Sequence, residues 1–217
     1  MIIAVDGPAA SGKGTLARRL AQHFNLGHLD TGKLYRAAAL RALASGGDPA
    51  DPALAEAAAK AVRAADLGDP RLADEAVARG ASVVAAIPAV RQALFAFQRD
   101  FVRHPPGGAA GAVLDGRDIG TVICPDADAK LFITAGIEAR AARRFKELRD
   151  RGKAAIYEAV LQDMKDRDAR DSQRRAAPMV PADDAFVLDT TALDADAAFA
   201  AALDFIGRKL AAAPAKG

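Results

Sequence analysis

The apolar positions of the chain fall into short unbroken runs and longer stretches with helical spacing. Residues 1–7, MIIAVDG, form a β-branched apolar run that stops at a glycine, which is typical of a buried strand. Between Gly12 and Phe24, apolar residues recur every three or four positions, which predicts a helix. The same patterns predict strands at 26–30, 111–116, 129–135 and 185–191, and helices at 32–44, 49–65, 71–86, 88–103, 137–151, 155–175 and 194–211. Residues 212–217 should fray.

The order of these elements predicts the fold class. Strands that alternate with helices indicate an α/β fold, with a parallel sheet and helices on both of its faces. Ligands of such sheets bind beyond the carboxyl ends of the strands. The runs IIAVD and AVLD both stop at a glycine, Gly7 and Gly116, so we expect both to end at one cleft.

The composition narrows the classes of function. With 51% hydrophobic and 27% charged residues, the chain resembles ordinary globular proteins. A formal charge of +2 and the lack of tryptophan argue against nucleic-acid or membrane binding. No apolar run reaches the roughly 18 residues of a membrane span, and no export signal is visible. The single cysteine, Cys124, cannot form an internal disulfide, so we expect a cytoplasmic protein.

The segment GPAASGKGT, from Gly7 to Thr15, is the strongest local signal. It follows a predicted strand, opens a predicted helix and matches the phosphate-binding pattern G-x-x-x-x-G-K. In that pattern the backbone N–H groups surround phosphates, the lysine (Lys13) reaches the β- and γ-phosphates, and a hydroxyl helps to hold magnesium. Gly14 occupies the usual hydroxyl position and Thr15 follows it. A glycine-rich turn that caps an ordinary helix is the alternative. The candidate ATP ligands are Gly7, Pro8, Ala9, Ala10, Ser11, Gly12, Lys13, Gly14 and Thr15.

The stretch KDRDARDSQRR, residues 165–175, contains five basic residues and three aspartates. Runs of this kind usually form a solvated helix face. On a helix, however, Arg167, Arg170, Asp171 and Arg174 follow each other at three- and four-residue spacing and share one face. A charged face of this kind fits a lid over an active site. Together with the phosphate-binding segment and the motifs described next, it favours a clamp for an anionic, hydroxyl-bearing ligand over a solvated face.

Several motifs together resemble one family. They are LDTGKLYR at 29–36, ASVVAAIPAVR at 81–91, DGRDIGT at 115–121 and RDARDSQRRAAPMVP at 167–181. With the phosphate-binding segment they resemble the bacterial cytidylate kinases over nearly the whole chain. Adenylate kinases and eukaryotic UMP/CMP kinases have Asp-Gly-Phe-Pro-Arg where this chain has DGRD at 115–118. The resemblance implies a P-loop kinase fold and an enzyme that uses ATP and Mg²⁺ to phosphorylate CMP or dCMP.

The resemblance also implies residue roles. The catalytic residues would be Lys13, Arg117 and Arg174. The acceptor nucleotide would be bound by Arg36, Arg117 and Arg174 at its phosphate, by Ser82, Arg91 and Asp118 at cytosine, by Thr31 beside the base, and by Arg167 and Asp171 at the ribose. Arg143 would contact ATP, with Arg140 and Arg144 as secondary candidates. Thr15 and, through water, Asp115 would hold the metal ion.

The resemblance further implies one P-loop kinase domain over residues 1–217 that acts as a monomer. Its core would span about 1–40 and 109–210, its acceptor-binding insert about 50–105 and its lid about 140–175. Only residues 66–80 stand where many relatives have extra strands, so we expect a shortened, helical insert. Lys33 adds a positive charge beside the DTG turn. The alternatives are a UMP or shikimate-type kinase and a nucleotide-dependent RNA-binding protein.

Overall fold

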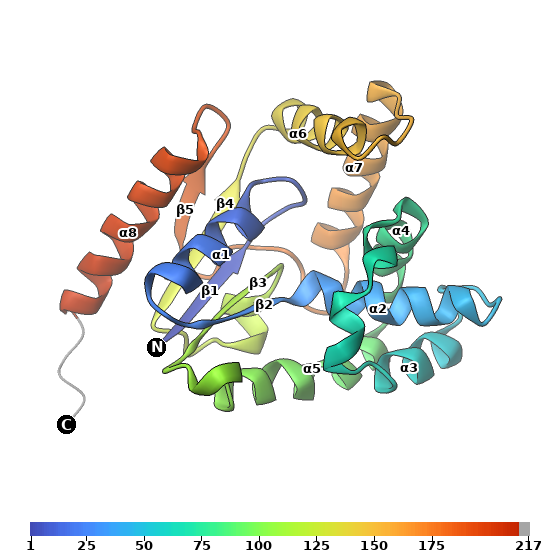
Figure 1. Cartoon of the computed structure of the whole chain (residues 1–217), viewed down its shortest axis with the longest axis horizontal. Coiled ribbons are helices and arrows are strands. Elements are labelled where there is room, and N and C mark those ends of the chain that lie inside the picture. The colour runs from blue at the N-terminus through green and yellow to red at the C-terminus, as the bar shows by residue number, and fades with distance from the viewer. Residues whose placement is uncertain (213–217) are drawn as a thin grey trace.

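The computed structural model describes residues 1–212 and contains one five-stranded parallel sheet (Figure 1). The strands are β1 (Ile2–Asp6), β2 (Gly27–Asp30), β3 (Ala112–Gly116), β4 (Ala129–Thr134) and β5 (Phe186–Asp189). Their order across the sheet is β2-β3-β1-β4-β5, and each neighbouring pair is parallel. All five predicted strands are present, so the predicted α/β class is confirmed. The predicted frayed end lies, apart from Ala212, outside the described residues.

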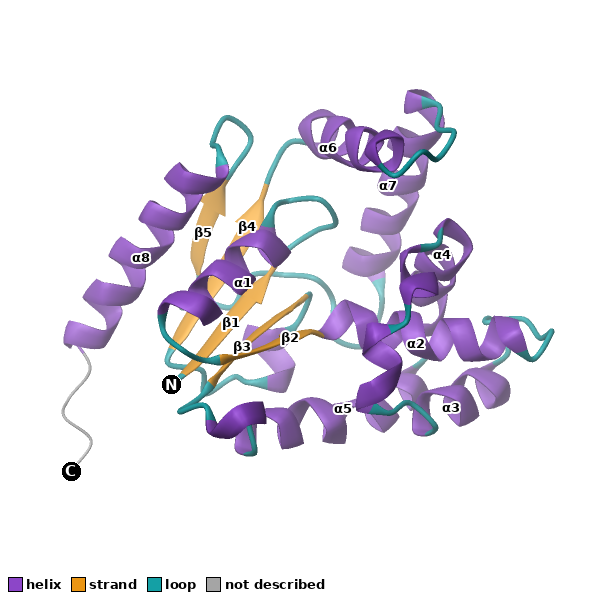
Figure 2. Cartoon of the chain, viewed as in Figure 1, coloured by secondary structure: helices purple, strands orange, loops and turns teal. Residues whose placement is uncertain are grey.

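Helices cover both faces of the sheet (Figure 2). They are α1 (Lys13–His23), α2 (Thr31–Ala44), α3 (Pro52–Lys60), α4 (Glu75–Val84), α5 (Pro88–Arg103), α6 (Ile137–Asp150), α7 (Tyr157–Gln173) and α8 (Ala195–Ala212). Because successive strand side chains point to opposite faces, Ile3 and Val5 of β1 pack in the cluster of α1 and α8. Ala4, between them, packs in the cluster that includes α2 and α5.

Two groups of helices stand beside the sheet, beyond the ends of its strands. Helices α3 and α4 pack on α2, while α6 and α7 pair with each other and lie above α4 in Figure 1. Both groups follow strands whose carboxyl ends lie at one edge of the sheet, so the ligand cleft expected there lies between them and β1, β2 and β3.

The segment between α2 and α5 differs most from prediction. The helix predicted at 49–65 is too long, because α3 begins at Pro52, capped by Asp51, and ends at Lys60. The helix predicted at 71–86 is wrong at its start, because Pro70–Ala73 is a 3₁₀ turn and α4 begins at Glu75. Another 3₁₀ turn spans Ala64–Gly68. The side chains of Asp51 and Asp69 accept hydrogen bonds from the backbone and start new helical turns at positions that alanine content alone does not predict.

Three smaller features were also not predicted. The loop at 104–108 contains a 3₁₀ turn, Pro106–Gly108, and Ile119–Ile123 forms one turn of π-helix directly after the DGRD motif. Helix α7 ends at Gln173, because Arg174 is extended, with φ −62° and ψ 139°. Arg174 therefore leaves the helix instead of completing its last turn.

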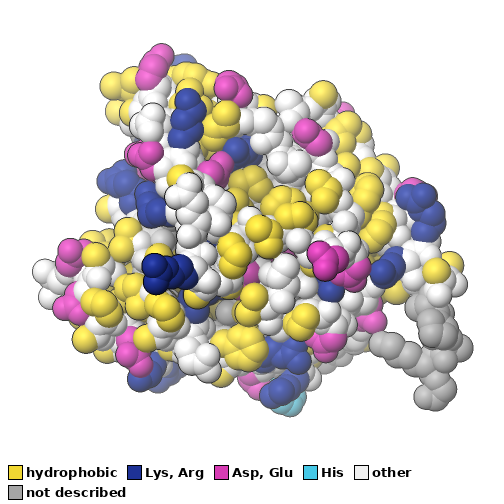
Figure 3. Space-filling model, turned by 180° about the vertical axis from the view of Figure 1, so that it is seen from behind, with side chains coloured by type: hydrophobic (Ala, Val, Ile, Leu, Met, Phe, Trp, Pro, Cys, Tyr) yellow, Lys and Arg dark blue, Asp and Glu magenta, His cyan; other side chains and the backbone are white. Residues whose placement is uncertain are grey.

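Within residues 1–212, no single helix is long and apolar enough to span a membrane, and α4 with the segment 88–108 passes that test only as a pair bent by 100°. On the reverse face, apolar side chains are interspersed with charged ones (Figure 3). Among the described residues, the large hydrophobic side chains that are exposed include Ile156, Val180 and Val187.

Candidate active site

The phosphate-binding segment is a tight loop between β1 and α1. Gly7 has φ 142°, and a Cβ there would lie 2.0 Å from the carbonyl oxygen of Ile133 in β4, so only glycine fits. Ala10 and Gly12 have left-handed φ values of 57° and 89°, which fold the loop back before α1 begins at Lys13. A loop of this shape at a helix N-terminus is a site for anions.

Lys13 extends along this loop toward the cleft. Its Nζ lies 3.3 Å from the carbonyl oxygen of Pro8. Burial, followed by the nearby charge of Arg117, lowers the pKa of Lys13 to about 7. The carboxylates of Asp115 and Asp30 act in the opposite direction. A bound polyphosphate would add negative charge and favour the protonated ammonium group.

Asp115 ends β3 against the same loop. Its carboxylate lies 3.8 Å from where a Cβ on Gly14 would stand, and its Oδ2 lies 2.8 Å from Nε2 of His28. Asp115 is 4% exposed. The described residues contain no group of three His, Cys, Asp or Glu side chains that would hold a metal alone. This arrangement suits Mg²⁺, which binds through one or two carboxylates, water and substrate phosphates.

Arginines gather next to Lys13. Arg117 donates from Nε to Oδ2 of Asp171 over 3.0 Å, and Arg36 donates from Nη1 to the carbonyl oxygen of Leu72 over 2.9 Å. Burial, followed by the charge of Arg117, lowers the pKa of Arg167 to about 10. The Nε of Arg167 is buried and has no hydrogen-bond partner in the described chain. Since an unpaired buried donor is costly, this group is a place where ligand oxygen atoms fit.

A second polar group lies around Asp118. Arg91 of α5 forms an ion pair with Asp118, and its guanidinium stands 5.5 Å from the ring centre of Tyr35. Arg174 approaches the other oxygen of Asp118, with 3.6 Å from Nη2 to Oδ1. That Nη2 is buried without a hydrogen-bond partner in the described residues. Asp118 is 4% exposed, so this donor–acceptor group is held away from bulk water.

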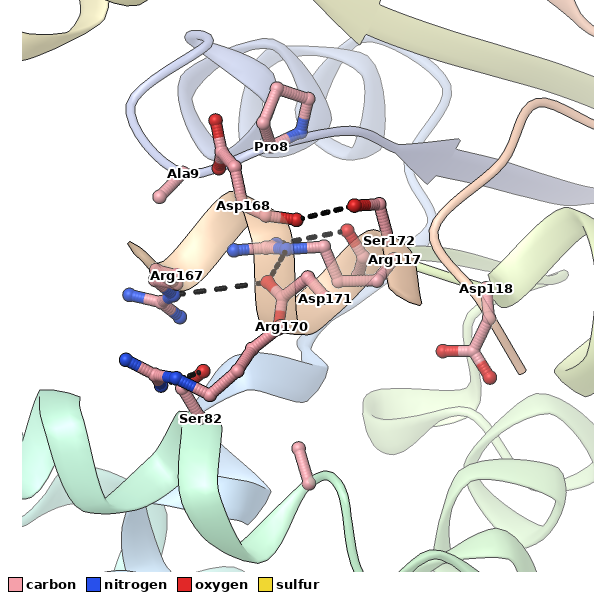
Figure 4. A network of polar contacts seen from close by, with 12 residues as sticks. Pro8, Ala9, Ser82, Arg117, Asp118, Arg167, Asp168, Arg170, Asp171 and Ser172 are labelled. Carbon is pink, nitrogen blue, oxygen red and sulfur yellow. Dashed lines mark hydrogen bonds and ion pairs between the residues drawn. The ribbon is translucent and has the colours of Figure 1, made fainter. Parts of the chain in front are cut away.

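Helix α7 carries the charged stretch into the same cleft. Figure 4 shows Arg167, Arg170 and Asp171 projecting from this helix. These three residues and Arg174 line the cleft, whereas Lys165 is exposed and does not. Arg167, Arg170 and Asp171 therefore approach the cleft from α7, as predicted, whereas Arg174 follows the end of the helix and reaches the cleft from an extended residue. Burial by itself would raise the pKa of Asp171, but the charges of Arg117, Arg167 and Arg174 hold it below the usual range. Asp171 is therefore an ionised acceptor at neutral pH.

Comparisons with known proteins decide the family. The family model "Cytidylate kinase" matches residues 3–208. The chain belongs to the cytidylate kinase family. It is 59% identical to a cytidylate kinase of Paramagnetospirillum magneticum, over 96% of this chain and 98% of the relative, and 57% identical to one of Rhodospirillum rubrum, over the same shares. A solved structure of an uncharacterized protein from Eubacterium ventriosum is similar in fold, with a TM-score of 0.54 at 16% identity, over 96% of this chain and 98% of that one. The resemblance seen in the motifs is confirmed.

The cleft of this cytidylate kinase family member brings together most of the predicted site residues. Those that line it are Ala9, Ala10, Lys13, Gly14, Thr31, Arg36, Ser82, Arg91, Asp115, Arg117, Asp118, Arg167, Asp171 and Arg174. Gly7, Pro8, Ser11 and Gly12 do not line it, but they form the bend of the phosphate-binding loop.

Besides these loop residues, four sequence-based candidates lie outside the cleft lining. Arg140 is buried and donates from Nε to the carbonyl oxygen of Ala135. Thr15 is exposed, and its hydroxyl lies 3.3 Å from Nη2 of Arg18. Arg143 donates to the hydroxyl of Thr190, beyond the end of β5. Lys33 is exposed and donates to the carbonyl oxygen of Leu67, on the outer side of α2. Their roles toward metal, ATP and acceptor stay predictions.

Some contacts within the site were not predicted from the sequence. Arg170 donates to the hydroxyl of Ser82 over 2.6 Å, and Arg144 forms an ion pair with Glu75. His28 is half-buried, and its Nε2 lies 2.8 Å from Oδ2 of Asp115. Its position on β2, next to β3 in the sheet, is the signal that would have suggested this contact.

Proposed function

We propose that this chain transfers the γ-phosphate of ATP to CMP or dCMP and releases ADP and CDP or dCDP. Membership of the cytidylate kinase family supports the reaction. The observation that carries the proposal is the single cleft that joins Lys13 of the phosphate-binding loop to the Arg91–Asp118–Arg174 group. A donor nucleotide at one end and a pyrimidine at the other would direct their phosphates toward each other.

At the donor end, the loop from Gly7 to Thr15 binds the triphosphate of ATP. Lys13 neutralises charge on the β- and γ-phosphates. Because the pKa of Lys13 is low in the free protein, the bound phosphates also keep its amino group protonated. Arg143 is the candidate contact for the rest of ATP. Mg²⁺, when bound, neutralises phosphate charge; Asp115, through water, and Thr15 are the candidates to hold it.

At the acceptor end, the phosphate of CMP lies near Arg36, Arg117 and Arg174. Guanidinium groups can each donate two parallel hydrogen bonds to a phosphate. Nε of Arg174 donates to the carbonyl oxygen of Ala177 and its Nη2 lies 3.6 Å from Oδ1 of Asp118, so a contact with the phosphate requires this side chain to move. Transfer depends on this positioning and on charge neutralisation, because the protein itself forms no covalent bond in such reactions.

The base of CMP lies between Ser82, Arg91 and Asp118, beside Thr31. Cytosine has acceptors at O2 and N3 and a donor at its 4-amino group. Arginine supplies donors and the side-chain oxygens of Asp118 supply an acceptor, whereas uracil, which lacks the amino group, would leave that acceptor without a partner. Asp171, which lies next to Arg117 and Arg167, contacts the ribose together with Arg167.

The two helix groups beside the sheet act as moving parts of one kinase domain. The segment 50–105 binds the acceptor, and the segment 140–175 is the lid that excludes water. Ion pairs such as Arg144–Glu75 and Arg79–Asp163 already join α6 and α7 to α4. The enzyme works as a cytoplasmic monomer on small molecules, without a nucleic-acid or membrane partner.

A coupled assay of ADP release tests this function. The protein is mixed with ATP, Mg²⁺ and one of CMP, dCMP, UMP or AMP, and a reaction without acceptor gives the background hydrolysis. We expect CMP and dCMP to give the highest kcat/KM. A preference for UMP or AMP would contradict the proposed acceptor, and ADP release that needs no acceptor would contradict transfer.

A further inference from the structure

Arg170 contacts a residue of the opposite side of the cleft. Its Nη1 lies 2.6 Å from Oγ of Ser82, which is 88 positions away in the chain. Ser82 belongs to α4 and is 4% exposed, whereas Arg170 reaches it from α7 (Figure 4). Both residues line the cleft. The contact therefore joins the lid helix to the serine that, under the proposed function, lies at the base.

The chemistry of the two groups fixes the direction of this hydrogen bond. A guanidinium group has five N–H donors and no acceptor, so the serine oxygen must accept. The O–H of Ser82 then cannot point at Arg170, and the hydroxyl keeps one donor and one lone pair for other partners. Without the arginine, the hydroxyl would rotate among the staggered orientations. Arg170 thus restricts the rotation of the Ser82 hydroxyl, which a base would otherwise have to restrict when it binds.

The surroundings show why this contact differs from the other bridges between the helix groups. Arg79 and Asp163 are both largely exposed and lie 3.9 Å apart. Exposed pairs at such distances contribute little to stability. Ser82, in contrast, is buried and uncharged, and it shares the cleft with Asp118. A shift of α7 would therefore change the hydrogen bonding of a group at the base end.

We propose that Arg170 is a positioning residue for base recognition. It orients the Ser82 hydroxyl toward the pyrimidine, and it does so only when α7 is in place. Recognition of the base and closure of the lid are coupled through this one hydrogen bond. The inference rests on the proposed function, in particular on the placement of the base at Ser82.

A double-mutant cycle tests the coupling. Arg170→Met keeps an unbranched side chain but removes every donor, and it should raise KM for CMP about tenfold, the low end for a hydrogen bond to a charged group. The ratio of kcat/KM for CMP to that for UMP should fall, while KM for ATP stays the same. In a Ser82→Ala background, Arg170→Met should add nothing. Arg170→Lys, which still donates, should recover part of the loss.

Lys165→Met is the matched control, because Lys165, like Arg170, is an exposed cation on α7 but does not line the cleft. It should leave KM for CMP unchanged. Equal losses from Arg170→Met with and without Ser82 would overturn the proposal, as would wild-type kinetics for Arg170→Met. Thermal melts exclude unfolding as the cause of a loss. Failure of the wild-type enzyme to phosphorylate CMP would instead contradict the proposed function itself.

Discussion

The donor half and the acceptor half of the cleft are built in different ways. The donor half is one continuous loop between β1 and α1, shaped by backbone conformation at Gly7, Ala10 and Gly12. The acceptor half consists of side chains from five places, α2, α4, α5, the end of β3 and α7, between Arg36 and Arg174. A contiguous loop depends on local geometry. The acceptor half is complete only when all of these elements are in position, so a movement of the helices would open or close it.

The largest effect should come from the donor half. Lys13→Ala removes the ammonium group nearest the transferring phosphate, and electrostatic groups of this kind contribute about 3–4 kcal/mol or more to the barrier. We expect kcat to fall by on the order of 10²- to 10³-fold in the ADP-release assay. Because Lys13 is not a packing residue, the melting temperature should stay within a few degrees of wild type. Near-full turnover would remove Lys13 from the mechanism.

The next effect concerns specificity in the acceptor half. Asp118→Asn preserves the shape of the side chain but replaces an obligatory acceptor with a group that also donates. The ratio of kcat/KM for CMP to that for UMP should then fall about 10- to 150-fold, the range for a hydrogen bond to a charged group. If steady-state kinetics with both acceptors give an unchanged ratio, Asp118 does not read the base.

Asp171→Ala should have a smaller effect, which differs between the two natural acceptors. Asp171 stays ionised because three arginines lower its pKa, so it accepts hydrogen bonds from ribose hydroxyls. CMP has a 2′-hydroxyl and dCMP does not, and kcat/KM should therefore fall more for CMP, by about tenfold or more. Arg117 loses its partner as well, so dCMP should also lose some activity. Unchanged kinetics for both nucleotides would mean that the charged stretch is only a solvated face at this position.

The smallest effect on turnover should come from Asp6, which joins the two halves. Its carboxylate accepts hydrogen bonds from the N–H groups of Ile119 and Gly120, just after the DGRD motif. Burial raises its pKa to about 7, with Asp118 adding to the increase, although the two N–H groups and Arg117 oppose it. Asp6→Asn should leave the chemistry of transfer intact.

The consequence for stability follows from the sign of this pKa shift. In the unfolded chain Asp6 has its ordinary pKa of 3.8, whereas in the folded protein its pKa is about 7 and it keeps its proton to that pH. The folded state therefore binds more protons between these values, and this group's contribution to the free energy of unfolding falls as pH rises through that window. The free energy of unfolding, measured in urea at pH 4.5 and pH 7.5, should include this contribution in the wild type but not in Asp6→Asn. Equal pH dependence in both proteins would contradict the assignment.

The donor half was more predictable than the acceptor half for a physical reason. The strand, the glycine-rich loop and the helix follow one another in the chain, so the local sequence GPAASGKGT determines the shape of the loop. The strands of the sheet were predicted because buried parallel strands are continuous apolar runs. The bounds of the helices in the segment 50–105 were predicted wrongly, because Asp51, Asp69 and two prolines start or end helices within alanine-rich sequence.

Contacts between distant segments could not be predicted from spacing alone. The spacing of Arg167, Arg170, Asp171 and Arg174 predicted one face of a helix, but not that Arg170 would reach Ser82 on α4. In the same way, nothing local connects His28 with Asp115, which meet because β2 and β3 are neighbours in the sheet. The expected roles of Ser82 and Arg91 came from the family resemblance, because a single serine or arginine in a predicted helix does not indicate that it binds a base.

The central claim is that CMP occupies the dispersed half of the cleft with its phosphate directed at Lys13. A crystal structure of the enzyme with CMP bound tests it most directly. We predict that the cytosine lies within hydrogen-bond distance of Ser82, Arg91 and Asp118, that the ribose contacts Asp171, and that the phosphate contacts Arg36 and Arg117. A base bound against the phosphate-binding loop, or a phosphate that faces away from Lys13, would contradict the account.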